Sequence, residues 1–179
     1  ERWSGTIVFV AQPAEEIVAG ARAMLDDGLY TRFPKPDVAL AFHDDAMLPA
    51  GKVGYREGPF MSAVSSLDVL VRGVSGHGSA PHTAKDPVLL ASQIVVALQA
   101  IVSREVAPGT RAVVTVGTIH GGLKRNIIPD EVVLTGTIRS FKPAVRTKML
   151  AGIERTAKAV AAMSNAPEPV VMITEGIKA

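Results

Sequence analysis

Cysteine, aromatic residues and an excess of one charge are all missing or scarce in this sequence, and each absence excludes a class of protein. None of the 179 residues is cysteine, which excludes disulfide bonds and thiolate metal ligands. Aromatic residues make up 4% of the chain and do not interleave with the basic ones. The 19 basic residues nearly balance the 17 acidic ones, so nothing indicates a nucleic-acid surface. The lack of cysteine is typical of a reducing compartment, and we expect a cytoplasmic protein without a membrane partner.

A long uninterrupted hydrophobic run is also absent. The longest apolar stretch, residues 87–102, is interrupted by Ser92, Gln93 and Gln99, and we expect it to be too short to span a bilayer. We expect no signal peptide before the first apolar run. The sequence begins in the approach to a predicted strand, so we expect an interior segment of a longer protein. With 47% apolar residues, a packed core is expected.

The first part of the chain has the pattern of a β-α-β unit. Residues 5–11 form a continuous apolar run, which is typical of a strand buried in a parallel sheet. Residues 16–29 have a helical pattern with Gly28 as its stop, and residues 37–43 form a second apolar run. Because two strands and one helix cannot enclose a core, we expect the rest of this α/β sheet to lie outside the chain.

The second part predicts a separate α+β domain. An N-cap at Asp86 and a proline at position 87 open a long helix, and a second helix begins at Pro143. The predicted order is β-α-β-β-α-β, the ferredoxin-like arrangement of a four-stranded antiparallel sheet with both helices on one face. The predicted elements are a strand at 65–72, a helix at 86–105, strands at 111–119 and 131–139, a helix at 143–165 and a strand at 168–175.

Two adjacent carboxylates and a histidine follow the predicted strands of the first part. Glu15 and Glu16 come after the carboxyl end of one strand, where open α/β sheets bind their ligands, and His43 ends the next strand. A carboxylate and an imidazole at one sheet edge suit a divalent transition metal, and the second carboxylate could take a proton from water. In the alternative interpretation, the two glutamates are the solvated first turn of a helix and His43 is a satisfied loop histidine.

Two loops of the second part carry further polar side chains. His77 and His82 lie in the Gly- and Ser-rich segment 73–82, where glycines let a ligand approach the backbone, although a flexible polar turn has the same composition. A zinc site formed by these two histidines lacks a third ligand nearby. Asn126 lies in the loop 120–130, which is longer than a hairpin requires; turn chemistry is the alternative for this residue.

Arg139 ends a predicted strand whose neighbours on the same face are threonines. Its guanidinium could hold a carboxylate through two hydrogen bonds, or it could be a solvated charge at the sheet edge.

Six motifs in order resemble those of the M20 metallopeptidases, in particular the amidohydrolases of N-acyl amino acids such as hippurate hydrolase-like enzymes. They cover essentially the whole chain. The motifs are "QPAEE", "FH" followed by "LPAGKVG", "SGHGSAPH", "DP" at a helix start, "GGLKRNIIPD" and "GTIRS". The resemblance implies a catalytic-domain segment at residues 1–57, a lid or dimerisation domain at 58–175, and the start of the return to the catalytic domain at 176–179.

The resemblance also implies roles for single residues. Glu15 would be the general base that activates water, while Glu16 and His43 would be metal ligands. His77 and Asn126 would reach the active site of a partner subunit and stabilise the developing oxyanion. Arg139 would hold the carboxylate of the substrate.

The resemblance further implies two divalent ions, zinc or manganese, and a homodimer formed through the lid domain, with an N-acyl amino acid as substrate.

This sequence departs from the family pattern in two places. Asp44 and Asp45 follow the histidine, where the family has an aromatic residue and a proline. The upstream and downstream metal-ligand motifs are absent, so we expect the segment alone to be inactive. The alternatives are a dipeptidase or carboxypeptidase of the same family, and a stand-alone ferredoxin-like dimerisation or binding module without catalysis.

Overall fold

The computed structural model describes residues 4–177 and divides into two compact units, residues 1–56 and 57–179. Each unit is described by itself. The last two residues of the segment 176–179, which was expected to begin a return to the catalytic domain, lie outside the described residues.

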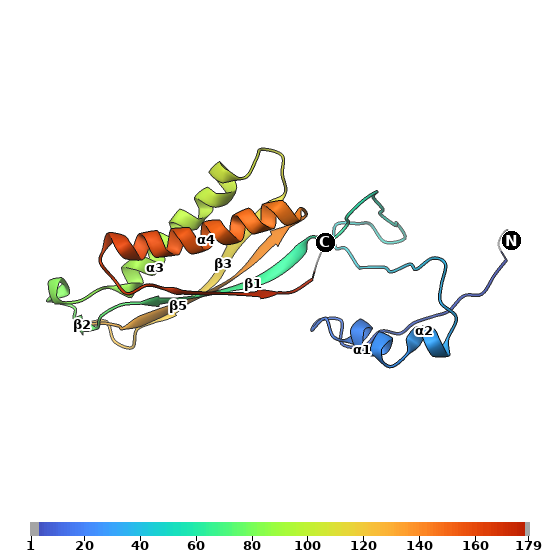
Figure 1. The fold of residues 1–179 in the computed structure, drawn as a ribbon, viewed down its shortest axis with the longest axis horizontal. Helices are drawn as coiled ribbons and strands as arrows, with labels where there is room; N and C mark the ends of the chain where they lie inside the picture. The colour runs from blue at the N-terminus through green and yellow to red at the C-terminus, as the bar shows by residue number, and fades with distance from the viewer. Residues whose placement is uncertain (1–3, 178–179) are drawn as a thin grey trace. The chain divides into compact units, whose positions relative to one another are not determined.

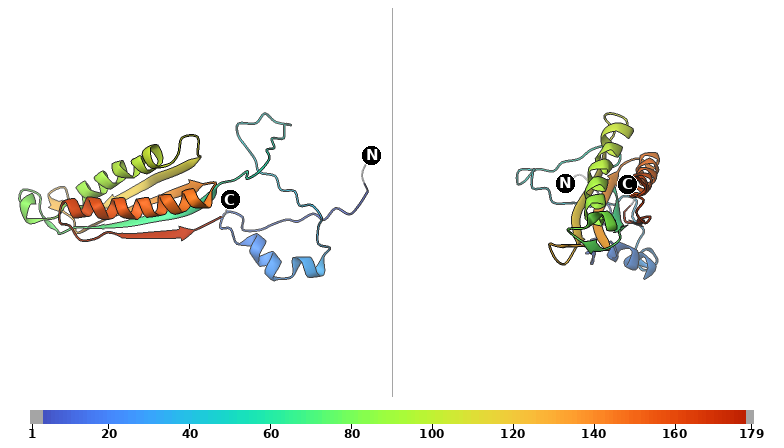
Figure 2. Two further views of the ribbon diagram at one scale, coloured as in Figure 1. Left: turned by 45° about the horizontal axis from the view of Figure 1, so that its top comes forward. Right: turned by 90° about the vertical axis from the view of Figure 1, so that its left-hand side faces the viewer.

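The second unit is a four-stranded antiparallel sheet with two long helices on one face (Figure 1; Figure 2, left). The strand order across the sheet is β3-β5-β1-β6, so β3 and β6 are its outer strands. The long elements follow one another as the sequence pattern predicts, with ends within a few residues of the expected ones. They are β1 (Ala63–Arg72), α3 (Pro87–Ala100), β3 (Ala112–Gly121), β5 (Glu131–Ser140), α4 (Pro143–Met163) and β6 (Val170–Glu175).

Alternation along the strands places the core between the sheet and the helices. Leu67, Val69 and Val71 of β1 are at most 1% exposed, and their polar neighbours in sequence lie on the opposite face. Met149 and Ile153 of α4 are fully buried, as the helical stripe predicts. Further buried core residues are Leu90, Ile94, Leu98, Val132, Leu134, Ile138 and Ala157.

Helix α3 begins where its capping signals predict. Asp86 lies in the extended region, and its Oδ1 accepts hydrogen bonds from the backbone N–H groups of Val88 at 2.8 Å and Leu89 at 3.3 Å. The helix ends in a π turn, η2 (Ile101–Glu105), in which the Val106 N–H donates to the Ile101 carbonyl.

By length and composition alone, the continuous helix Pro87–Glu105 is long and apolar enough to cross a membrane. The expectation that this apolar stretch is too short to span a bilayer was therefore wrong. The π turn extends the helix to Glu105, beyond the end of the apolar run at residue 102. One face of this helix packs on the sheet through Leu90, Ile94 and Leu98, which is the position of a core helix in this fold.

A second, smaller sheet joins two loops of this unit. Strands β2 (Gly76–His77) and β4 (Ile127–Ile128) pair antiparallel, with Gly76 opposite Ile128 and His77 opposite Ile127. The 3-10 turn η1 (Pro81–Thr83) follows β2. This ladder explains why the loop 120–130 is longer than a hairpin needs.

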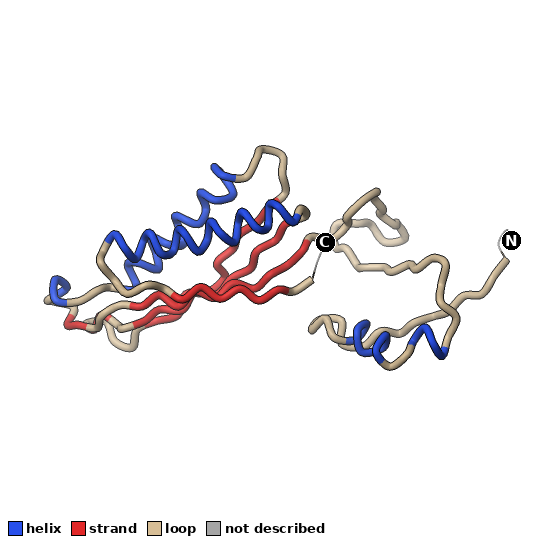
Figure 3. Tube along the Cα trace, viewed as in Figure 1, coloured by secondary structure: helices blue, strands red, loops and turns tan. Residues whose placement is uncertain are grey.

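The first unit contains the helices α1 (Gly20–Asp26) and α2 (Leu29–Arg32), and its described residues contain no strand (Figure 3). The strands predicted at 5–11 and 37–43 are therefore corrected to extended segments. Their side chains are exposed, with Phe9 at 89% and Phe42 at 82%. A strand exists through hydrogen bonds to neighbouring strands, and no described residue supplies them. The apolar composition alone does not create the strand.

The helix predicted at 16–29 is also shorter than expected. Residues 15–18 form a turn, and α1 begins only at Gly20. Gly28 stops this helix as predicted: it has φ of +87°, and its N–H donates to the Leu25 carbonyl at 3.0 Å. The later start leaves the two adjacent glutamates outside the helix.

Candidate functional site

Glu15 and Glu16 lie in a tight turn with an unusual backbone. The Val18 N–H donates to the Glu15 carbonyl at 2.8 Å and closes the turn. Ala14 and Val18, which flank the pair, have φ of +52° and +56°. Positive φ is costly for a β-branched residue, and such strain concentrates at functional sites. The glutamates are thus not the first turn of a helix, which removes the helix-dipole explanation for them.

His43 has one ring nitrogen fixed by its own backbone neighbour. Its Nδ1 lies 2.7 Å from the Asp44 carbonyl oxygen, and because a carbonyl only accepts, Nδ1 carries the proton. The pKa of His43 is raised above its ordinary value, first by this hydrogen bond and then by the Asp44 carboxylate 3.3 Å away, with smaller contributions from Glu15 and Asp45. In the neutral ring, the lone pair remains on Nε2, the form in which histidine ligates a metal.

The side chains of this unit include the right types of ligand for a divalent metal, but too few of them. A carboxylate and an imidazole with a free Nε2 lone pair are ligands that zinc and manganese accept. Among the described residues, however, no group of three or more His, Cys, Asp or Glu side chains could hold a metal ion. Glu15 is close enough to act electrostatically on His43. These residues therefore form part of a possible site and need further ligands.

The β2–β4 ladder brings together His77 and Asn126, which are distant in the sequence. The Gly78 N–H donates to the Asn126 carbonyl at 2.8 Å, and His77 is paired with Ile127. A Cβ on Gly78 would lie 3.2 Å from the Asn126 carbonyl oxygen, so glycine permits this close approach. Both side chains are exposed. The segment 73–82 is therefore an ordered structure held by backbone hydrogen bonds, not a flexible turn.

The other two predicted positions in this unit, Arg139 and His82, lie outside the β2–β4 ladder. Arg139 lies near the end of β5, opposite Val64 of β1 and Val113 of β3, and is exposed on the face of the sheet away from the helices. Thr137 lies on the same face, as expected. His82 lies in η1 and is exposed.

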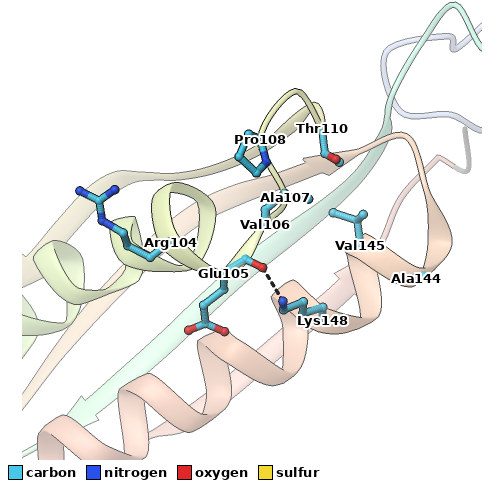
Figure 4. A pocket seen from close by; sticks show the side chains of 9 residues that line it. All are labelled: Arg104, Glu105, Val106, Ala107, Pro108, Thr110, Ala144, Val145 and Lys148. Atoms are coloured by element: carbon cyan, nitrogen blue, oxygen red, sulfur yellow. Dashed lines mark hydrogen bonds between the residues drawn. The ribbon is translucent and has the colours of Figure 1, made fainter.

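A shallow hollow of ≈ 400 Å³ lies between the π turn and the start of α4 (Figure 4). Lys148 Nζ donates to the Glu105 carbonyl across it, and the Glu105 carboxylate accepts from Arg155 at 2.5 Å. These contacts join the π turn η2 to α4. The lining contains no histidine and no pair of carboxylates, so we interpret it as a structural gap between helices.

Three polar contacts, made by Ser79 and Arg146, escaped the interpretation of the sequence. Ser79 hydrogen-bonds the His77 ring, and a signal for this was present in the spacing His-Gly-Ser. Arg146 of α4 donates to the buried hydroxyl of Ser65 at 3.1 Å and pairs with Glu175 at 2.9 Å. Nothing in the sequence indicates that these three residues meet, because they belong to three different elements.

Comparison with known families identifies the second unit. Residues 62–165 match the family model described as the peptidase dimerisation domain of M20 peptidases. This match covers more than half of the chain.

Curated proteins and solved structures agree with that match. The chain is 35% identical over 158 residues to an N-acetylcysteine deacetylase of Bacillus subtilis (strain 168), covering 88% of this chain and 41% of the relative. It is 38% identical over 147 residues to thermostable carboxypeptidase 2 of Saccharolobus solfataricus, covering 81% of this chain and 37% of the relative.

A crystal structure of the Bacillus subtilis protein YxeP, described as a dinuclear metal binding peptidase from the M20 family, superposes with a TM-score of 0.67. It is 29% identical and covers 93% of this chain and 40% of that one. The chain thus spans about two fifths of the length of the relatives it matches.

Proposed function

The chain belongs to the M20 peptidase family, and from this premise we propose that the whole protein hydrolyses the amide bond of N-acyl amino acids. The observation that carries the proposal is that two histidines, His43 and His77, are held by different hydrogen bonds. His43 keeps a free Nε2 lone pair because its Nδ1 donates to a carbonyl, whereas the ladder holds His77 beside Asn126. One arrangement suits a metal ligand and the other suits recognition of an oxygen atom. Amide hydrolysis needs both.

Each proposed residue has one task in this reaction. Glu15 takes a proton from the attacking water and passes it to the departing amine. Glu16 and His43 hold metal, and the strained turn and the Asp44 carbonyl fix their orientation. His77 and Asn126 donate hydrogen bonds to the carbonyl oxygen as it becomes negative, in the active site of a partner subunit.

Arg139 completes the proposed set by binding the substrate carboxylate, and its exposure on the open sheet face leaves the guanidinium accessible.

Two divalent ions, zinc or manganese, belong to the proposal for the full-length protein. When bound, they would polarise the amide carbonyl and lower the pKa of the attacking water. The dinuclear centre named for the Bacillus subtilis structure supports this number. We also propose that residues 1–57 belong to the catalytic domain and residues 58–175 to a lid of ferredoxin-like topology. The strand order β3-β5-β1-β6 with two helices on one face supports that classification.

The metal content of two variants of the full-length protein tests these roles. Glu15→Gln should retain the metal of the wild type and lose turnover, because it removes the base and not a ligand. Glu16→Ala should bind metal poorly. Elemental analysis of both purified proteins, together with turnover of hippurate, measures the difference. Equal loss of metal in the two variants would contradict the assigned roles.

A second candidate, a carboxypeptidase or dipeptidase, is favoured by the identity to the Saccharolobus solfataricus enzyme. The two reactions would use the same residues. Their substrates differ only in the acyl group, which carries the carbonyl of the scissile amide bond. The full-length protein should cleave hippurate faster than unblocked dipeptides, measured as kcat/KM. The reverse order would favour the peptidase.

We propose that the protein is a homodimer formed through β3 and the exposed face of α3. The family description names dimerisation, β3 is an outer strand, and α3 contacts it. Both elements carry exposed apolar side chains, Val96 of α3 at 73% and Ile119 of β3 at 50%.

Sedimentation of Val96→Glu tests the proposed dimer surface. The variant should be monomeric with an unchanged circular dichroism spectrum. The control Met163→Glu, which changes an apolar residue of α4 that is 77% exposed, should remain dimeric. A dimeric Val96→Glu protein would exclude this surface.

A further inference from the structure

The ring of His77 accepts two hydrogen bonds from a single neighbour. The backbone N–H of Ser79 donates to Nδ1 at 3.1 Å, and the Ser79 hydroxyl lies 2.7 Å from the same nitrogen. A backbone N–H can only donate, so Nδ1 must carry a lone pair and no proton. The hydroxyl can rotate, and it therefore donates as well. Nδ1 is thus occupied, and the proton of the neutral ring must be on Nε2.

We propose that Ser79 is a positioning residue that holds His77 in the tautomer protonated on Nε2, so that the ring offers an N–H donor to an oxygen ligand. This inference rests on the proposed function and makes it more specific, because it states which atom of His77 faces the substrate. In this form Nε2 has no lone pair for a metal and cannot take up a proton. His77 then acts as a donor to the developing oxyanion and not as a base.

The backbone around Ser79 fixes the geometry of these two bonds. The Ala80 N–H donates to the His77 carbonyl at 2.8 Å and closes a tight turn over the serine. The Gly78 N–H is engaged with the Asn126 carbonyl at 2.8 Å, which ties the same turn to the opposite strand. The donor at Ser79 is therefore part of a connected set of hydrogen bonds, and its direction does not depend on a free side chain.

The charges of the two loops agree with a ligand oxygen that carries negative charge. The segment 73–82 contains no Asp or Glu, and neither does the segment 120–126. The second segment contributes the cations Lys124 and Arg125 directly before Asn126. No carboxylate of these segments would repel an anionic oxygen at His77 Nε2, and the two cations would attract it.

The tautomer can be observed directly by nuclear magnetic resonance of the ¹⁵N-labelled 179-residue chain. Long-range ¹H–¹⁵N correlation spectra above the titration range of histidine distinguish a protonated Nε2 from a protonated Nδ1. We expect His77 to show a protonated Nε2 and a hydrogen-bonded Nδ1.

Variants of Ser79 give the comparison. Ser79→Ala removes the hydroxyl donor and should change the Nδ1 shift and raise the population of the other tautomer. Ser79→Thr keeps the hydroxyl and should restore the wild-type spectrum, while the signals of His82 serve as an internal control. A protonated Nδ1 in the wild type would overturn the proposal, as would identical His77 spectra in the alanine and threonine variants.

Kinetics of the full-length protein separate this inference from the proposed function. Ser79→Ala should lower kcat by about 2- to 10-fold, the effect of one hydrogen bond, with metal content unchanged. Ser79→Thr should recover most of this loss. If His77→Ala leaves turnover unchanged, the proposed catalytic role of His77 fails. If His77→Ala abolishes turnover while Ser79→Ala changes neither spectrum nor kcat, the role of Ser79 fails and the proposed function stands.

Discussion

The contact of Arg146 with Ser65 and Glu175 gives a stability prediction whose size can be worked out from the structure. The Ser65 hydroxyl is almost completely buried, at 2% exposure, and accepts from Arg146 at 3.1 Å and 3.3 Å. The arginine side chain is 22% exposed, whereas Glu175 is 64% exposed. The buried hydrogen bonds should therefore contribute more than the ion pair, which solvent screens.

Arg146→Met keeps most of the packing of the side chain but leaves the buried hydroxyl without its donor. Loss of a charged hydrogen bond together with an unsatisfied buried oxygen should cost about 2–3 kcal/mol of the free energy of unfolding. Ser65→Ala removes the hydroxyl itself and should cost about 1 kcal/mol. Glu175→Gln should change stability by less than about 0.5 kcal/mol, because that contact is at the surface.

A double-mutant cycle measures the contact itself. Urea unfolding followed by far-ultraviolet circular dichroism reports mainly on the second unit, which contains the two long helices and the sheet. The double variant Arg146→Met with Ser65→Ala should be more stable than the sum of the single effects by about 1–2 kcal/mol, since the alanine removes the oxygen that the arginine satisfied. Additive single effects, or a cost below about 0.5 kcal/mol for Arg146→Met, would refute this reasoning.

Three further substitutions in the second unit are expected to lower stability in the same urea assay, each with a matched control. Ile94→Ala removes a fully buried side chain and should cost about 2–5 kcal/mol, whereas Met163→Ala at an exposed position outside the proposed dimer surface should stay within about 0.5 kcal/mol; similar values would contradict the assigned core. Asp86→Ala should cost about 1 kcal/mol through loss of the helix cap, and Asp86→Asn should retain most of it; an equal loss in both would exclude capping as the cause. Gly136→Ala should cost about 1–3 kcal/mol, because its Cβ would lie 2.1 Å from the Thr115 carbonyl oxygen, while Gly117→Ala, whose nearest contact would be at 3.9 Å, should be nearly neutral; a neutral Gly136→Ala would show that β3 moves away easily.

The second unit was predictable because its sequence signals are local. The alternation of Leu67, Val69 and Val71 defines the buried face of β1 without knowledge of its neighbours. The cap at Asp86 uses its own next residues, and the stripe through Met149 and Ile153 belongs to one helix. In each case, the residues that determine the element are also the residues that form it.

The errors in the first unit have the opposite cause. The segments 5–11 and 37–43 have strand composition, but a parallel strand is formed by hydrogen bonds to its neighbours. None of the described residues supplies these bonds, and the apolar side chains remain exposed. Composition therefore indicated a tendency to form strands, but residues 4–56 contain no neighbouring strand with which these segments could pair.

The site was predictable only in part, because residue type does not specify hydrogen-bond direction. The motifs named His43 and His77, but only the geometry shows that a carbonyl accepts from Nδ1 of the first and an N–H donates to Nδ1 of the second. The pairing of His77 with the strand that follows Asn126 was likewise invisible, since β2 and β4 are too short to leave an alternating pattern.

The opposite hydrogen bonds of the two histidines also bear on the zinc-site interpretation of the segment 73–82. A zinc site at His77 and His82 needs a lone pair on a His77 nitrogen that can reach the metal. In the proposed tautomer, Nδ1 of His77 accepts from Ser79 and Nε2 carries the proton, so neither nitrogen offers a lone pair to a metal. The same fold leaves the lone pair of His43 free on Nε2. These opposite hydrogen bonds support the proposal that His43 binds metal and that His77 donates a hydrogen bond, although the two residues have the same side chain.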